Sequence, residues 1–136
     1  MTAGYSGTPL AKKLGIKGGF TVYAVNAPDN YADMLDPLPA DVKIIEKGAT
    51  NVDIVHLFTN SVAELQKKLS QCRNLIKKDG SIWVSWYKKA AKLPTEITED
   101  SIREACFPLG LVDIKVCAVD EKWSGLKLVI RKENRV

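Results

Sequence analysis

The sequence predicts an α/β fold, with helices covering both faces of a mostly parallel sheet. Apolar runs typical of buried strands alternate with helical patterns along the chain. The last two predicted strands, by contrast, are joined by a connection too short for a parallel crossover, so they pair antiparallel. The length of 136 residues and an apolar content of 46% fit one domain over residues 1–136 with its own core, which includes an N-terminal arm and short helix over residues 1–17.

The first half of the chain contains two short helices and three strands. Thr8-Pro9 is a helix start, because a hydroxyl stands at the N-cap and proline at the first helical position. Gly15 suits the position just after that helix, and Asn26-Ala27-Pro28 ends the first strand. The patterns predict helices over 10–14 and 31–35, and strands over 20–25, 42–45 and 52–58.

The second half begins with the clearest helix of the sequence. Ser61 and Glu64 have the spacing of a capping box, and apolar residues from Val62 to Ile76 keep helical spacing. Asp79-Gly80 is a turn signal that we expect to end this helix. A strand over 81–86 follows.

A further helix and two strands complete the predicted pattern. Thr98 caps a helix whose end Pro108 and Gly110 define, and strands near 112–119 and 126–131 follow it. A terminal antiparallel pair after an alternating α/β pattern is the element order of class I methyltransferase-like Rossmann folds. We therefore expect a reduced, three-layer version of that architecture, in which right-handed crossovers determine most of the topology.

Composition excludes several classes of protein. The 20 Lys and Arg residues against 16 Asp and Glu give a formal net charge of +4, short of the basic bias of a nucleic-acid binder. No apolar run could span a membrane, and the first residues lack the features of a signal peptide. The scattered cysteines 72, 106 and 117 read as reduced thiols. We expect a cytoplasmic protein.

In an open α/β sheet, ligands bind beyond the carboxyl ends of the strands. A nucleotide or S-adenosylmethionine site needs a glycine-rich turn after the first strand, but this chain has Asn26-Ala27-Pro28-Asp29 there. Glu46 is a weak candidate for the acidic residue expected at the end of the second strand. The glycine-rich turn that usually binds the cofactor is therefore missing, and we assign no cofactor, metal or catalytic residue.

His56, the only histidine, has two interpretations. Alternation puts it on one face of its strand with Ile54 and Phe58, which favours a hydrogen-bonded core histidine. The alternative is a proton-transfer group in a cleft. Trp123 likewise packs either on its own domain or on a partner, and both readings stay open.

Two further expectations concern the cleft. The segment Gly4 to Ile16 should pack beside the carboxyl ends of the strands, with Tyr5 and Leu10 buried. A small polar or anionic ligand should meet amide, hydroxyl, imidazole and ammonium groups there, next to an aromatic wall, and Asn26, His56 and Ser85 should line one concavity. The predicted ligand-binding residues are Asn26, Tyr31, His56, Thr59, Ser85, Trp86 and Lys88.

Several strings of residues resemble a bacterial family known only as domain of unknown function 3052. The resemblance runs from Gly4 to about Arg131, and Tyr87 departs from the proline expected after Trp86. The family implies no activity, cofactor or catalytic residue. The strings that carry the resemblance are Gly4-Tyr5-Ser6-Gly7-Thr8-Pro9-Leu10, Lys13-Leu14-Gly15-Ile16-Lys17, Asn26-Ala27-Pro28 with Tyr31, Trp83-Val84-Ser85-Trp86, Gly110-Leu111-Val112-Asp113, Lys115-Val116-Cys117-Ala118-Val119-Asp120 and Trp123-Ser124-Gly125-Leu126-Lys127-Leu128.

The leading functional hypothesis is a non-catalytic module that binds a small ligand or another protein. The missing glycine loop and the lack of a paired acid and base motivate it. The alternative is a divergent S-adenosylmethionine-dependent group transferase with its ligand at the same cleft. Nucleic-acid binding is a weaker third hypothesis, a membrane partner is not expected, and a homo-oligomer remains open.

Overall fold

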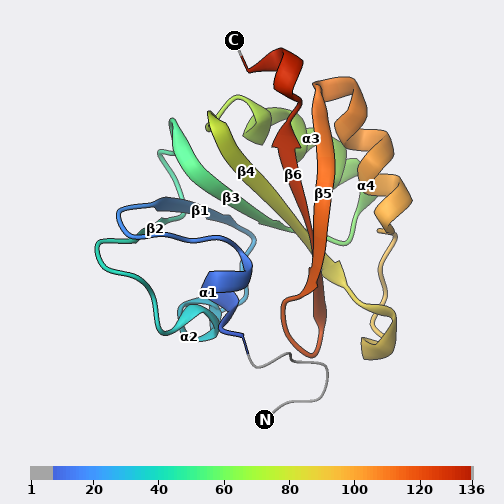
Figure 1. Cartoon of the computed structure of the whole chain (residues 1–136). Coiled ribbons are helices and arrows are strands. Elements are labelled where there is room, and N and C mark those ends of the chain that lie inside the picture. The colour runs from blue at the N-terminus through green and yellow to red at the C-terminus, as the bar shows by residue number, and fades with distance from the viewer. Residues whose placement is uncertain (1–7, 136) are drawn as a thin grey trace.

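The computed structural model describes residues 8–135 and has one six-stranded sheet in the order β2-β1-β3-β4-β6-β5 (Figure 1). Strand β1 pairs parallel with β2 and β3, and β3 pairs parallel with β4. Strand β6 runs antiparallel to both of its neighbours, so the predicted parallel sheet with an antiparallel C-terminal hairpin is confirmed. The strands are β1 (Thr21–Val25), β2 (Lys43–Ile45), β3 (Val52–Phe58), β4 (Ile76–Tyr87), β5 (Leu111–Ala118) and β6 (Trp123–Ile130).

Helices cover both faces of the sheet, which gives the expected three layers. The α-helices are α1 (Leu10–Lys13), α2 (Tyr31–Leu35), α3 (Val62–Arg73) and α4 (Glu99–Cys106), and the 3₁₀ turns are η1 (Lys89–Ala91), η2 (Phe107–Leu109) and η3 (Lys132–Asn134). Helices α3 and α4 pack on one face, and α1 and α2 on the other. No helix within residues 8–135 is long and apolar enough to cross a membrane.

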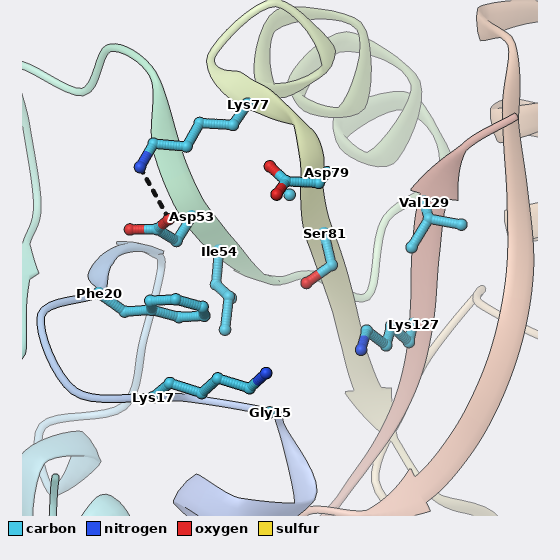
Figure 2. A pocket seen from close by; sticks show the side chains of 11 residues that line it. Gly15, Lys17, Phe20, Asp53, Ile54, Lys77, Asp79, Ser81, Lys127 and Val129 are labelled. Atoms are coloured by element: carbon cyan, nitrogen blue, oxygen red, sulfur yellow. Dashed lines mark ion pairs between the residues drawn. The ribbon is translucent and has the colours of Figure 1, made fainter. Parts of the chain in front are cut away.

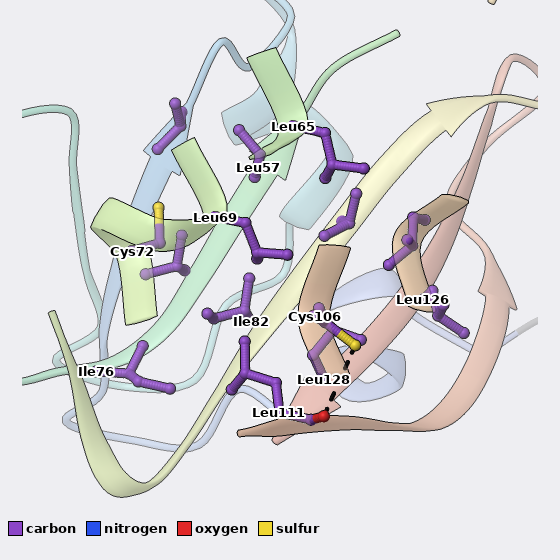
Figure 3. Close-up of a cluster of buried hydrophobic side chains, with 14 of the residues drawn as sticks. Leu57, Leu65, Leu69, Cys72, Ile76, Ile82, Cys106, Leu111, Leu126 and Leu128 are labelled. Carbon is purple, nitrogen blue, oxygen red and sulfur yellow. Dashed lines mark hydrogen bonds between the residues drawn. The ribbon is translucent and has the colours of Figure 1, made fainter. Parts of the chain in front are cut away.

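The core under α3 and α4 is the larger and is almost purely apolar (Figure 3). Helical spacing directs Leu65, Leu69 and Cys72 of α3 at the sheet, while Ile102 and Cys106 come from α4. All five side chains are buried. Burying each leucine or isoleucine stabilises the fold by about 1.5–3 kcal/mol before the entropy of ordering is subtracted. This layer holds α3 and α4 at the sheet.

The core under α1 and α2 is built around Trp83, which is fully buried at the middle of β4. Its indole Nε1 donates a hydrogen bond of 3.0 Å to the Leu14 carbonyl oxygen, just after α1. Leu10 is also buried here, as predicted, whereas Tyr5 lies outside the described residues. This bond and the buried Leu10 tie the N-terminal segment to the face of the sheet.

The predicted docking of that segment beside the carboxyl ends of the strands stays a prediction, because residues 4–7 lie outside the described residues. Lys13 Nζ donates a hydrogen bond of 3.3 Å to the carbonyl oxygen of Ala118, at the end of β5, and Gly15 and Lys17 line a pocket among residues at the start of β3 and near Ser81 of β4. Because α1 has only four residues and follows directly on Pro9, it spans little of the sheet. The segment's buried residues Leu10 and Leu14 belong to the same cluster as Phe58, the last residue of β3.

The junction between α3 and β4 also differs from the prediction. Helix α3 ends at Arg73, and Ile76 already belongs to β4, where it pairs with Val52. Asp79-Gly80 lies within that strand, at a register shift in which β4 carries extra residues opposite β3. The spacing of Cys72 and Ile76 fits a helix, but tertiary pairing with β3 decides the outcome.

Candidate functional site

Three of the predicted ligand-binding residues form a sealed chain of hydrogen bonds. Tyr31 Oη lies 2.7 Å from His56 Nδ1, and His56 Nε2 lies 2.7 Å from Ser85 Oγ. The exposed fractions of Tyr31, His56 and Ser85 are 5%, 0% and 0%. Tyr31 comes from α2, His56 from β3 and Ser85 from β4, so the chain joins the helix to two neighbouring strands. His56 is therefore a hydrogen-bonded core residue.

Aromatic packing closes the space around this chain. The imidazole of His56 stacks on Phe58 with 4.2 Å between ring centroids, and Tyr31 meets His56 edge-on at 5.3 Å. Trp123 packs edge-on against Phe58 at 4.9 Å and lies 4.5 Å from the ring of Tyr87. Trp123 thus packs on its own domain.

Burial also determines the charge of the chain. Desolvation lowers the pKa of His56 to about 3, so its imidazole is neutral at pH 7. Burial raises the pKa of Tyr31 well above its ordinary value of 10, so the phenol keeps its proton. A neutral imidazole donates through one nitrogen and accepts through the other, which two hydroxyl neighbours satisfy completely. Ser85 and His56 have the residue types of a nucleophile and a base, but a substrate cannot reach them.

A polar pocket lies at the carboxyl ends of β1 and β2. Its volume is about 410 Å³, and its polar lining comes from Asn26 and Asp29 after β1, Glu46 after β2 and Lys68 on α3. Glu46 and Asp29 are exposed, whereas Lys68 is half-buried. Two carboxylates, an ammonium and an amide therefore face one hollow. This is where an open parallel sheet places its ligands.

Asn26 turns the chain at this pocket in the way that a glycine would. Its φ is +57°, in the left-handed region, which asparagine tolerates better than most residues. Its side-chain Nδ2 donates a 3.3 Å hydrogen bond to the Phe58 carbonyl oxygen at the end of β3. The loop after β1 is thereby tied to the neighbouring strand.

A second hollow of about 590 Å³ follows β4, on the side of α4. Trp86 and Ile97 contribute apolar walls, and Lys88 and Lys89 contribute cations. Asn60 connects two segments next to this hollow. Its Oδ1 accepts the Tyr87 N–H at 2.8 Å, and its carbonyl oxygen accepts the Glu96 N–H at 2.9 Å. This hollow is more apolar than the one beside Asn26.

The predicted site residues do not share one concavity, so that expectation is wrong. His56 and Ser85 are sealed in the core, Asn26 lines the first pocket, and Trp86 and Lys88 line the second. The physical reason is α2, whose Tyr31 closes the face of the sheet over His56. Ligand binding by any of these residues stays a prediction.

Thr59 is also buried, and it explains why the predicted capping box is only half formed. Ser61 Oγ accepts the Glu64 N–H at 3.2 Å, as a box requires. The Glu64 carboxylate, however, accepts a hydrogen bond of 2.6 Å from Thr59 Oγ1. The Glu64 side chain therefore anchors the end of β3.

Sequence reasoning missed two residues of the pocket beside Asn26. Asp29 stands in the loop after the first strand and Lys68 in the predicted helix after Ser61, but neither is among the predicted site residues. The helical position of Lys68, one residue before the buried Leu69, was a usable signal, since it puts the ammonium at the border of the sheet. Glu46 was correctly noted as the acid after the second strand.

Residues 11–132 match the model of a family described as a protein of unknown function, DUF3052. No curated protein matches the sequence. Among solved structures, a candidate type 11 methyltransferase from Sulfolobus solfataricus superposes with a TM-score of 0.65 at 16% identity, covering 92% of this chain and 91% of the other.

Two further structures have the same architecture. An S-adenosylmethionine-dependent methyltransferase from Aquifex aeolicus gives a TM-score of 0.65 at 13% identity, covering 89% of this chain and 88% of its own. Fibrillarin from Aeropyrum pernix, which holds natively bound S-adenosyl-L-methionine, gives 0.57 at 12%, covering 93% and 70%. At such identities the likeness establishes a methyltransferase-like fold and nothing about activity.

Proposed function

The chain belongs to the DUF3052 family of proteins of unknown function, and from that starting point we propose that it is a non-catalytic module that binds a small polar ligand. The ligand would occupy the pocket at the carboxyl ends of β1 and β2. One observation carries the proposal. The pair of His56 and Ser85, which has the residue types of a base and a nucleophile, is sealed in the core, whereas Asn26, Asp29, Glu46 and Lys68 line an open pocket.

The chemistry of the lining suggests the class of ligand. Asp29 and Glu46 accept hydrogen bonds and favour hydroxyl or amino groups, and the Lys68 ammonium favours an acceptor or an anionic group. A small molecule that carries hydroxyl groups together with an amino or carboxyl group fits this set. Its apolar part would meet Ala24, Val25 and Ala27.

The three cysteines support a non-catalytic role. Burial raises the pKa of the Cys72 and Cys106 thiols to about 11, so both are protonated at pH 7 and are poor nucleophiles. Cys117 is half-buried, and desolvation raises its pKa as well. The free thiols also suit a reducing compartment, which supports a cytoplasmic location.

A divergent S-adenosylmethionine-dependent transferase is the second candidate, and Glu46 favours it. In dinucleotide-binding Rossmann folds, an acid about 20 residues after the first turn accepts a hydrogen bond from a ribose hydroxyl. Glu46 follows β2 and lines the same pocket as the left-handed Asn26. Against this candidate, Asn26-Ala27-Pro28 carries three side chains where glycines admit the ligand, and Pro28 lacks a backbone donor.

Calorimetric titration separates the two candidates. We would titrate the protein with S-adenosylmethionine, adenosine, choline and L-serine, and repeat each titration on Glu46→Gln. Glu104→Gln is the matched control, because Glu104 is exposed on α4 and does not line this pocket.

The proposal expects binding of at least one hydroxyl- or amino-bearing probe that Glu46→Gln weakens about tenfold and Glu104→Gln leaves unchanged. Micromolar affinity for S-adenosylmethionine with methyl transfer to an acceptor would favour the transferase instead. Failure of every probe would contradict small-ligand binding here and leave a protein-interaction module.

A further inference from the structure

A separate pocket lies at the opposite end of the strands, on the face that α1 covers. Its volume is about 290 Å³, and it is bordered by the start of β3, by Ser81 of β4, by Lys127 of β6 and by the Gly15–Lys17 segment after α1 (Figure 2). Ser81 pairs with Ile54 near the beginning of β3, whereas Asn26 follows the other end of β1. The two pockets are therefore on opposite edges of the sheet.

Of the three lysines that line this pocket, Lys77 is neutralised by Asp53, whereas no described residue neutralises Lys17 or Lys127. Lys17 and Lys127 both line it, and Figure 2 shows their side chains converging below Ile54. Neither ammonium has an ion pair or a hydrogen bond with any residue from 8 to 135. The nearby Asp53 carboxylate is engaged elsewhere: it forms a 3.0 Å ion pair with Lys77 and accepts the Thr21 N–H at 2.9 Å.

Asp79, the second acidic residue of the pocket, does not neutralise Lys17 and Lys127 either. Asp79 is exposed and forms no ion pair within the described residues. Meanwhile Lys127 is partly buried, and its pKa is lowered first by desolvation and then by the positive charges of Lys115 and Lys17. Like charges in a partly desolvated place cost free energy unless an anion joins them.

A serine hydroxyl points into the same space. Ser81 is 6% exposed, its Oγ makes no hydrogen bond with residues 8–135, and Figure 2 shows it directed into the pocket. Fully buried side-chain polar atoms in this part of the chain all have partners, so the Ser81 Oγ is reached through the pocket. A buried hydroxyl that lacks a protein partner and faces two free ammonium groups is an available hydrogen-bond donor for an anion.

We propose that this pocket binds a phosphate group, held by the Lys17 and Lys127 ammonium groups and by the Ser81 hydroxyl. A phosphate is dianionic near pH 7 and has several acceptor oxygens, so it can take two charge-assisted hydrogen bonds and one from a hydroxyl. The group can belong to inorganic phosphate or to a small phosphate ester. The site is independent of the ligand pocket beside Asn26.

Titration with two phosphate probes at constant ionic strength tests the site. Inorganic phosphate and glycerol 3-phosphate would each be followed by calorimetry and by the ³¹P resonance. The variants are Lys127→Met, which keeps the aliphatic stem, and Ser81→Ala. Lys78→Met is the control, because Lys78 is an exposed lysine of β4 that does not line the pocket.

The proposal expects saturable binding of at least one probe. Lys127→Met should weaken it roughly tenfold and Ser81→Ala roughly threefold, while Lys78→Met changes it less than about twofold. Tighter binding of the ester identifies a phosphorylated small molecule as the occupant, and equal binding identifies the phosphate group alone. Circular dichroism and melting curves confirm that each variant folds, and Lys127→Gln replaces Lys127→Met if it does not.

Two results would overturn the proposal. One is the absence of saturable binding of either probe up to about 20 mM at physiological ionic strength. The other is an equal loss of affinity in Lys127→Met and Lys78→Met, which is the behaviour of unspecific charge attraction. Because neither probe was used for the pocket beside Asn26, failure here leaves the proposed function untouched.

Discussion

His56 Nε2 lies 2.7 Å from Ser85 Oγ on the adjacent strand, and both side chains are completely shielded from solvent. In an accessible site this pair would be a base beside its nucleophile. Here Tyr31 occupies the other imidazole nitrogen and Phe58 stacks on the ring. The pair therefore links β3 to β4 and serves stability.

Removing the serine hydroxyl should cost stability. In Ser85→Ala, His56 Nε2 loses its partner while it stays buried, and an unsatisfied buried polar group costs about 1–3 kcal/mol. Urea denaturation measures the loss. Ser70→Ala is the control, because Ser70 is exposed on α3, and it should change the free energy of unfolding by less than about 0.5 kcal/mol. Equal stability of Ser85→Ala and wild type would contradict the hydrogen-bonded chain.

The neutral state of His56 predicts a pH dependence of stability. Burial lowers the pKa of the folded imidazole to about 3, whereas the unfolded imidazole has a pKa of about 6.5. Between these values the unfolded chain binds more protons, so the free energy of unfolding falls as pH drops from about 6.5 toward 3. The slope from this group is at most about 1.4 kcal/mol per pH unit.

Denaturation midpoints of wild type and His56→Gln, measured from pH 7 to about pH 4.5, isolate this contribution from that of the carboxylates. The variant should be less stable at pH 7 and should lose less stability on acidification. Parallel curves for the two proteins would show that His56 is accessible to protons in the folded state.

The left-handed backbone at Asn26 predicts how substitutions there change the stability of the protein. Its φ of +57° is unstrained for glycine but costs a residue with an ordinary Cβ roughly 1 kcal/mol. Asn26→Gly and Asn26→Ala both remove the weak bond to the Phe58 carbonyl oxygen, so their difference reports the backbone alone. We expect Asn26→Ala to be less stable than Asn26→Gly by about 1 kcal/mol in urea denaturation. The reverse order would contradict the observed turn.

Lys127 should destabilise the protein when the phosphate pocket is empty. Its partly buried ammonium has Lys17 and Lys115 as charged neighbours, and desolvation already lowers its pKa. Lys127→Met removes that charge and keeps the packing of the stem, so its melting temperature in phosphate-free buffer should rise by a few degrees. Lys78→Met should have the same melting temperature as the wild type. A lower melting temperature for Lys127→Met would reveal a stabilising partner of this ammonium.

Local chemistry explains why most elements were predictable. Thr98 begins α4 and hydrogen-bonds to Ser101 as a cap, and Gly110 ends η2 in the left-handed conformation, both as the sequence predicts. Ile76 was not predictable, because its helical spacing from Cys72 competes with its pairing to Val52, a residue far away in the chain. Local signals of caps and turns survive folding, whereas strand boundaries depend on the neighbouring strand.

The same difference between local signals and long-range contacts applies to the candidate site. Position after a strand correctly brought Asn26 and Glu46 to the carboxyl edge, since that follows from parallel topology alone. The burial of His56 did not follow, because it depends on how α2 packs and where the Tyr31 hydroxyl points. The pocket lined by Lys17 and Lys127 could not be predicted from the sequence for a similar reason. The two lysines come together only when α1 packs against the sheet.

The most direct test of ligand binding without catalysis is a ¹H–¹⁵N correlation spectrum of the labelled protein, recorded during titration with adenosine, choline and L-serine. The account predicts that at least one probe shifts the amides of Asn26, Asp29, Glu46 and Lys68 in a saturable way, while those of His56 and Ser85 stay in place. No shift of these four amides up to about 10 mM, or shifts centred on His56 and Ser85, would contradict it.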